Sequence, residues 1–167
     1  MNTRPLHLLP LVLVSMLALA AAPLELGPPW LSIEYPANPL DERTRDAFLT
    51  VNTYHHGTPT QFSLVGTAEG VVRGERRSLP LRFTATNRAW SQALTRQWPN
   101  EGRWVLHITL REGDTVGAAA LVVLGSDGTP AHTTVPVRRD GQWQIPRAVT
   151  AAEVDAALGT AGEQGRH

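Results

Sequence analysis

Apolar and polar residues alternate in short runs along most of this chain, and turn residues separate the runs. The clearest run covers 103–110, where every second residue is large and apolar: Trp104, Leu106, Ile108 and Leu110. This period of two predicts a β-strand with one buried face. By contrast, 117–124 is apolar throughout, which is typical of a central strand covered on both faces.

Further strands are predicted where similar runs lie between clusters of Gly, Pro, Asn and Asp. The segment 73–77, with Gly74 at its centre, predicts the tip of a hairpin. Seven or eight strands at this spacing favour an all-β sandwich over alternating strands and helices. The expected runs are 30–35, 47–55, 62–72, 79–85, 90–98 (which also fits a short helix) and 132–137.

One short helix is expected near the C-terminus. Thr150 and Glu153 have the spacing of a capping box, in which each residue satisfies a backbone donor of the other. Val154 and Leu158 follow at helical spacing, and Gly159 predicts the end of the helix.

The first 22 residues have the pattern of a secretory signal peptide. Arg4 is the only Arg, Lys, Asp or Glu among them, and an apolar run after it ends in small residues. Pro10 interrupts this run, which is shorter than the about 20 residues of a bilayer span. We expect cleavage near Ala20, and the alternative is an uncleaved anchor. The predicted organisation is a signal peptide at 1–22, an immunoglobulin-like β-sandwich at 23–149, and a short helix with a disordered tail at 150–167.

The composition limits where the protein works and what it binds. The chain has no cysteine, which excludes a lipoprotein and disulfides, and no Asn-x-Ser/Thr acceptor. The simplest interpretation is a bacterial periplasmic or secreted protein. The formal net charge of zero gives no indication of nucleic acid as a partner, or of a membrane surface for the mature form.

The available side chains also limit the chemistry. Every basic residue other than histidine is arginine, which excludes lysine Schiff bases. Met1 and Met16 both lie in the signal segment, so the mature chain has no sulfur ligand for a metal. Neither Gly-x-Ser-x-Gly nor His-Glu-x-x-His occurs, and the carboxylates are scattered. We therefore expect a protein that is not an enzyme.

The strand at 102–108 reads Gly-x-Trp-x-Leu-x-Ile and follows a Leu-Pro-Leu-Arg-Phe segment at 79–83. This layout resembles the exported immunoglobulin-like domains of the YtkA-like and FixH-like type. Those domains are small bacterial β-sandwiches, some of them linked to copper or cytochrome-oxidase assembly. The resemblance implies the fold. The copper-linked members use methionine or cysteine ligands, which the mature chain lacks.

The predicted hairpin tip is the first candidate binding site. It contains Arg73, Glu75, Arg76 and Arg77, and guanidinium groups can bind a carboxylate or a phosphate through two parallel hydrogen bonds. The alternative interpretation is a charged turn that keeps the hairpin soluble. The first hypothesis is a non-enzymatic binding or accessory module that contacts an unknown protein partner in the cell envelope through this tip.

Histidines give the second hypothesis, a periplasmic metal-binding accessory protein. His55, His56 and His107 are the first candidate ligands for Cu(II) or Zn(II). Adjacent residues on a strand face opposite ways, so His55 and His56 would not both join one site. The alternative is that these histidines are simply solvated and that no cofactor binds.

A sugar-binding module is the third hypothesis, because tryptophan rings can form a carbohydrate platform. Trp104 is expected in the core, whereas Trp98 and Trp143 are expected to be the most exposed. The five tryptophans are Trp30, Trp90, Trp98, Trp104 and Trp143.

Overall fold

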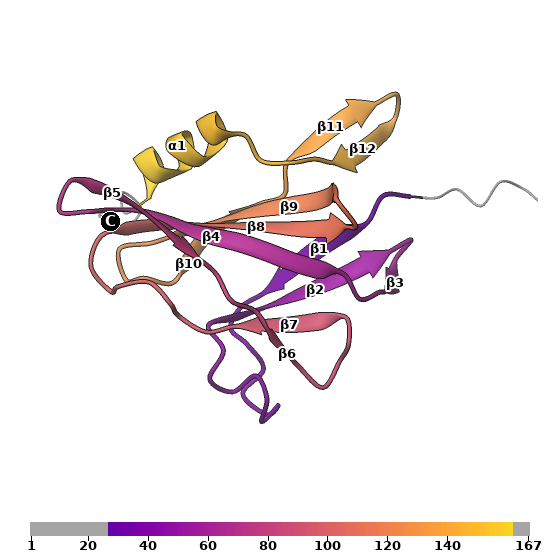
Figure 1. Cartoon of the computed structure of the whole chain (residues 1–167), viewed down its shortest axis with the longest axis horizontal. Helices are drawn as coiled ribbons and strands as arrows, with labels where there is room; N and C mark the ends of the chain where they lie inside the picture. The colour runs from indigo at the N-terminus through magenta and orange to yellow at the C-terminus, as the bar shows by residue number, and fades with distance from the viewer. Residues whose placement is uncertain (1–26, 162–167) are drawn as a thin grey trace, which may run out of the picture.

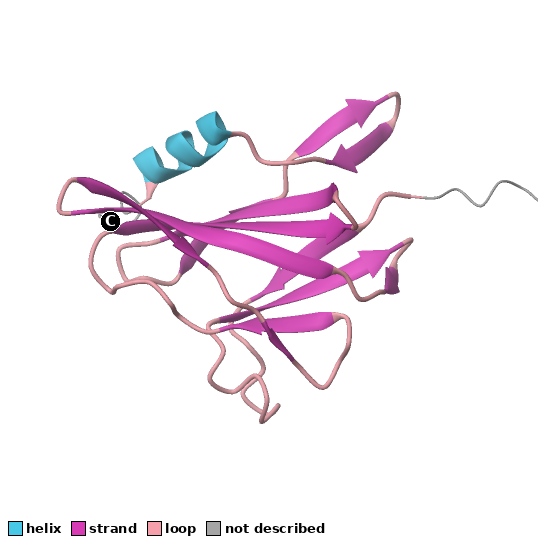
Figure 2. Cartoon of the chain, viewed as in Figure 1, coloured by secondary structure: helices cyan, strands magenta, loops and turns pink. Residues whose placement is uncertain are grey.

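The computed structural model describes residues 27–161, which form a β-sandwich with one short helix (Figures 1 and 2). The predicted signal peptide at 1–22 and the predicted tail beyond residue 161 lie outside the described residues. Within residues 27–161, no helix is both long enough and apolar enough to cross a membrane.

Two antiparallel sheets face each other. Sheet A has the strand order β1-β2-β7-β6, and the short β3 pairs with β2. Its strands are β1 (Trp30–Glu34), β2 (Leu49–His55), β3 (Thr58–Pro59), β6 (Thr84–Ala85) and β7 (Ser91–Leu94). Sheet B has the order β10-β9-β8-β4-β5. Its strands are β4 (Ser63–Val72), β5 (Glu75–Pro80), β8 (Arg103–Glu112), β9 (Thr115–Leu124) and β10 (Pro130–Thr134).

Two further elements lie on the outer side of sheet B (Figure 1). One is a separate two-stranded sheet made of β11 (Val137–Asp140) and β12 (Trp143–Pro146). We call this hairpin the arm. The other is helix α1 (Ala151–Thr160), which packs over β8, β4 and β9.

The strand order is that of an immunoglobulin-like domain. Strands β1-β2-β7-β6 correspond to A-B-E-D, and β9-β8-β4 correspond to G-F-C, with β5 in the place of C′. The predicted all-β, immunoglobulin-like sandwich with a short C-terminal helix is confirmed. The described residues form twelve strands rather than seven or eight, because β3 and β6 have only two residues each and the arm stands outside both sheets.

The main core lies between the two sheets. Trp104 on β8 is 3% exposed, as predicted, and its ring lies against Gly70 of the neighbouring strand β4. A Cβ atom at position 70 would overlap this ring, so the glycine makes room for the tryptophan. The other fully buried large side chains of this core are Leu31, Leu49, Val51, Leu94, Leu106, Ile108, Leu110, Val122 and Leu124.

A smaller core lies between sheet B and α1. Val154 and Leu158 of the helix pack against Val105, Leu121 and Val123 of the sheet. This second layer explains why β9 is apolar on both faces, as predicted, since Ala118 to Leu124 are all buried. The burial of one such side chain contributes about 1.5–3 kcal/mol.

The predicted helix start is confirmed, whereas the predicted end is wrong. Thr150 is the N-cap, and Glu153 completes the capping box. Gly159 does not end the helix, which continues through Thr160 to a C-cap at Ala161. Ala161 has a φ of −61° and is fully buried, so packing rather than a left-handed glycine sets this end.

Two predicted strands are divided in the structure. The run 79–85 is not one strand, because β5 ends at Pro80 and the chain crosses to sheet A as β6. Leu81 turns into the core at this crossing. The run 132–137 is divided at Val135–Pro136, where the chain leaves β10 and starts the arm. Both divisions lie beside a proline, which cannot donate a ladder hydrogen bond.

Of the predicted strand 90–98, only Ser91–Leu94 forms a strand, β7, and no part of the segment is helical. Trp98, which follows this strand, was expected at the surface but is only 3% exposed. Its ring meets Phe48 edge-on at 5.1 Å, and the Arg96 guanidinium lies 5.4 Å from the ring centroid. Trp98 is therefore a core residue, whereas Trp143 is 57% exposed, as predicted.

Candidate functional site

The arginine-rich hairpin joins β4 to β5, and its turn is shorter than the sequence suggested. Only Arg73 and Gly74 form the turn, with φ values of 51° and 84°. Positive φ at both central positions is the signature of a type I′ turn, which suits a two-residue hairpin. Glu75, Arg76 and Arg77 lie in β5, the edge strand of sheet B.

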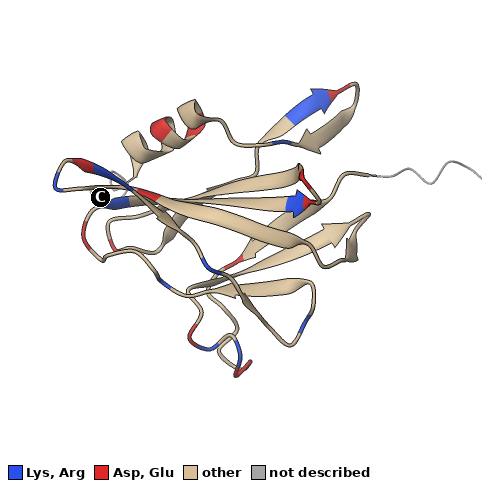
Figure 3. Ribbon diagram, in the orientation of Figure 1, with Lys and Arg blue, Asp and Glu red and all other residues tan. Residues whose placement is uncertain are grey.

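Each candidate arginine has an acidic partner. Arg73 Nη2 lies 3.1 Å from Glu101 Oε2, and Arg77 Nη2 lies 2.6 Å from Glu75 Oε2. Figure 3 shows how basic and acidic residues intermix along this hairpin. A carboxylate or phosphate ligand would have to compete with these acids for the same N–H groups.

Arg76 connects the hairpin to α1. It forms an ion pair with Asp155 of the helix and lies 3.6 Å from Glu69 Oε2 of β4. The hydrogen bond to Asp155 raises the pKa of Arg76. These exposed pairs contribute little to stability. They connect Arg76 to β4 and α1, so this arginine already has partners within the molecule.

The candidate metal ligands lie on two different sheets. His55 ends β2, and His56 follows it in the turn to β3, with the two ring centroids 4.3 Å apart. His56 Nδ1 accepts a hydrogen bond from the backbone N–H of Gly27. The described residues contain no group of three or more His, Asp or Glu side chains placed to hold a metal ion.

His107 lies apart from this pair, on the outward face of β8 in sheet B. Its Nε2 is 3.2 Å from Thr109 Oγ1. Burial lowers the pKa of His107, and the nearby Glu69 carboxylate opposes this effect. The structure therefore leaves His107 apart but brings His55 and His56 together. The expectation that these two face opposite ways is wrong, because His56 lies in the turn with a φ of 51° rather than on the strand.

The arm exposes apolar side chains that the two sheets do not cover. Trp143 is 57% exposed and Val137 is 39% exposed. Gly141, with a φ of 58°, takes the first position of the two-residue turn, as in a type II′ turn. Trp143 therefore presents a large apolar surface to the solvent.

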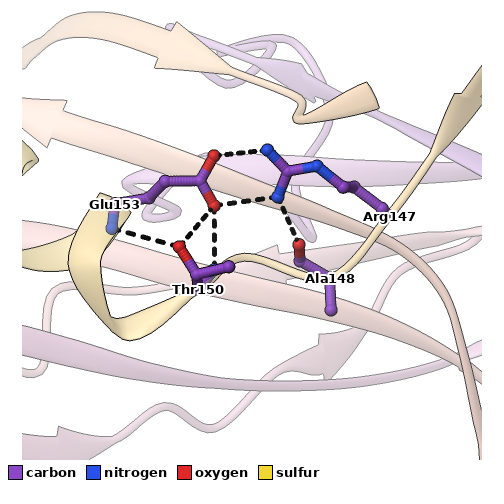
Figure 4. A network of polar contacts seen from close by, with 4 residues as sticks. All are labelled: Arg147, Ala148, Thr150 and Glu153. Atoms are coloured by element: carbon purple, nitrogen blue, oxygen red, sulfur yellow. Dashed lines mark hydrogen bonds and ion pairs between the residues drawn. The ribbon is translucent and has the colours of Figure 1, made fainter. Parts of the chain in front are cut away.

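A polar network fixes the arm to the start of α1 (Figure 4). Arg147, directly after β12, donates from Nη1 and Nη2 to the two carboxylate oxygens of Glu153, at 2.9 and 2.6 Å. Its backbone N–H donates to the carbonyl of Pro136, just before β11. Hydrogen bonds from Arg147 and then from Thr150 lower the pKa of Glu153 to about 2. The base of the arm is thus held by the same carboxylate that caps the helix.

An apolar groove of about 300 Å³ lies beside the base of the arm. Its lining includes Leu121 of β9 and Ala157 of α1, with His132 and Pro136 among its other residues. We call the arm and this groove together the arm surface.

A row of aromatic rings crosses the outward face of sheet A. Trp30 of β1 stacks on Tyr54 of β2, with centroids 4.5 Å apart and planes at 15°. Trp90 continues the row at 5.9 Å from Tyr54, and the Arg88 guanidinium lies over Trp90 at 5.5 Å. We call Trp30, Tyr54 and Trp90 the aromatic row.

The arm surface is not predictable from the sequence as a site. The sequence names Trp30 and Trp90 among the tryptophans of a possible carbohydrate platform, but it does not show that Tyr54 lies between them. Strand pairing places Trp30 opposite Tyr54, and it places Asp140 opposite Trp143. No protein-family model, curated protein or solved structure matches this chain. The function therefore has to be argued from these surfaces.

Proposed function

We propose that the protein is an exported, non-enzymatic binding module that contacts a protein partner of the cell envelope through the arm surface. One observation carries this proposal: Trp143 is 57% exposed on a two-stranded sheet that belongs to neither sheet of the sandwich. A two-stranded hairpin is marginally stable in water by itself. A projecting arm with a solvent-exposed tryptophan offers a docking site for another protein.

The arm surface has the composition of a protein contact. Tryptophan and arginine are enriched among the residues that contribute most to binding, and such residues fill pockets on their partners. The arm places Trp143 opposite Asp140, which pairs with Arg138 at 3.5 Å, and the groove at the base of the arm is apolar. The arginines of the β4–β5 hairpin are engaged with Glu75, Glu101 and Asp155, and that hairpin carries no exposed aromatic side chain.

A binding experiment with matched variants tests this proposal. Immobilised mature protein is incubated with an envelope extract of the source organism, and retained proteins are quantified by mass spectrometry. We expect one partner to be retained by the wild type and lost with Trp143→Ser. The control is Leu40→Ser, which changes a residue that is 89% exposed on a loop outside both sheets. Retention that survives Trp143→Ser but is lost with Arg73→Gln/Arg77→Gln would refute the arm surface.

The export part of the proposal rests on the sequence pattern of residues 1–22. We propose a periplasmic or secreted location, with removal of the signal peptide near Ala20. Edman sequencing of the protein recovered from the periplasm or medium is expected to start at residue 21. A full-length protein that stays in the membrane fraction would instead support the uncleaved anchor.

A metal-binding accessory protein is the second candidate, and the adjacent rings of His55 and His56 are the observation that favours it. Calorimetric titration with Cu(II) and Zn(II) separates the two candidates. Binding tighter than about 1 μM that is lost in His55→Ala/His56→Ala would support the metal function.

A further inference from the structure

The aromatic row offers an open ring face at the edge of sheet A. Trp30 lies in β1, which among residues 27–161 pairs only with β2 and is therefore an edge strand of the described sheet. Tyr54 covers one face of the Trp30 indole, and their planes are nearly parallel. Trp30 nevertheless remains 39% exposed. The accessible part of the indole is therefore the side turned away from Tyr54.

Polar groups surround this row. Ser32 and Glu34 share the outward face of β1 with Trp30, since residues alternate between the two faces of a strand. No outward position of β1 or β2 carries Leu, Ile or Val; these positions hold Trp30, Ser32, Glu34, Thr50, Asn52 and Tyr54. Thr50 and Asn52 are buried, at 3% and 7% exposed, so Ser32 and Glu34 are the polar side chains of these two strands that stay partly exposed beside Trp30.

We propose that the aromatic row binds a saccharide, with a pyranose ring stacked on the open face of Trp30. The C–H groups of a pyranose ring carry a slight positive charge, which matches the negative face of an indole. The sugar hydroxyls around that ring match Ser32 and Glu34, the polar side chains of β1 that stay partly exposed beside Trp30. An aliphatic protein segment would find no aliphatic partner on β1 or β2.

This site is independent of the arm surface. The row lies on the outward face of sheet A, whereas the arm and α1 lie on the outer side of sheet B (Figure 1). The saccharide proposal therefore stands or fails separately from the proposed protein partner, and different variants test the two.

Nuclear magnetic resonance can localise the ligand, because the chain has five tryptophans and hence five indole N–H signals. The mature ¹⁵N-labelled protein is titrated separately with chitohexaose, maltohexaose and cellohexaose, and the signals are assigned by single Trp→Phe variants. We expect one of these probes to shift the Trp30 and Trp90 signals with a Kd between about 0.01 and 1 mM. The Trp143 signal should not move.

Variants decide whether the row is the site. Trp30→Ala is expected to weaken binding at least about tenfold. Trp30→Phe retains a ring for stacking and should keep most of the affinity, and Trp143→Ala should keep all of it. Circular dichroism confirms that each variant is folded. The proposal is overturned if none of the three probes shifts Trp30 or Trp90 at about 10 mM, or if Trp30→Ala binds as tightly as the wild type.

Discussion

The β4–β5 hairpin and the arm are similar in sequence but differ in how the fold uses them. Both have two-residue turns with a glycine, and both carry arginines beside an acidic residue. The β4–β5 hairpin extends sheet B, and Arg76 ties it to α1. The arm is a separate sheet, and it leaves Trp143 open.

This difference shows that a cluster of charged residues in a predicted turn does not by itself identify a contact surface. The acidic partner of Arg76 lies 79 residues away in the chain, at Asp155. What remains available to a partner is decided by such long-range pairs. In this molecule the arginines of the hairpin have acidic partners, whereas Trp143 of the arm stays 57% exposed, so the arm is the more available surface.

The largest expected effect concerns the packing that makes the β4–β5 hairpin part of the sandwich. Gly70→Val places two methyl groups against the Trp104 ring and should cost about 3 kcal/mol of unfolding free energy. Urea denaturation followed by tryptophan fluorescence measures this cost. Val137→Ala in the arm is the control and should cost less than about 1 kcal/mol. Equal losses at the two positions would mean that the arm is as integral to the fold as the hairpin.

The next effect separates binding from stability. Trp143→Ala is expected to weaken partner binding by about 2 kcal/mol, or about 30-fold in Kd. Its unfolding free energy should change by less than about 0.5 kcal/mol, because the side chain is 57% exposed. Surface plasmon resonance with the isolated partner and urea denaturation give the two numbers. A variant that loses stability and affinity together would show that Trp143 supports the fold.

A smaller effect tests how the base of the arm is held. Glu153→Ala removes both the Arg147 ion pair and half of the capping box, and should cost about 1 kcal/mol. Hydrogen exchange at the first turn of α1 should become faster, with no change in β8. Faster exchange throughout sheet B would contradict a local role for this carboxylate.

The same carboxylate predicts a pH dependence. The pKa of Glu153 is lowered from 4.5 to about 2, first by Arg147 and then by Thr150. The ionised carboxylate therefore stabilises the folded protein above pH 4.5, and this contribution is lost as the pH falls towards 2. The stability difference between wild type and Glu153→Ala should shrink over this range. A difference that stays constant from pH 6 down to about 2 would mean that Glu153 acts through packing alone.

The smallest effect concerns the charged hairpin. Arg76→Gln removes the pairs with Asp155 and Glu69. Arg76 and Asp155 are exposed, and the half-buried Glu69 lies at a longer distance of 3.6 Å, so we expect a loss of about 1 kcal/mol. Because salt screens such pairs, the loss should decrease further in 1 M NaCl. Partner binding should be unchanged. A loss of binding with Arg76→Gln would indicate that this hairpin, rather than the arm, contacts the partner.

The sequence predicts those features that depend on neighbours within a few residues. The strict alternation of β8, the apolar β9 and the Thr150–Glu153 capping box are all local patterns, and the structure confirms them. The burial of Trp98 could not be predicted in this way, because it depends on Phe48 from a distant part of the chain. The arm surface and the aromatic row likewise depend on which strands pair with each other, and this pairing is not visible in local sequence patterns.

Site-specific photo-crosslinking in living cells tests the central claim that the arm, rather than the arginine hairpin, contacts the partner. A photoreactive phenylalanine is placed at position 143 in one strain and at position 73 in another, since both side chains are largely exposed. We predict one discrete crosslinked product from position 143 and none from position 73. A product from position 73 with none from position 143 would contradict the account.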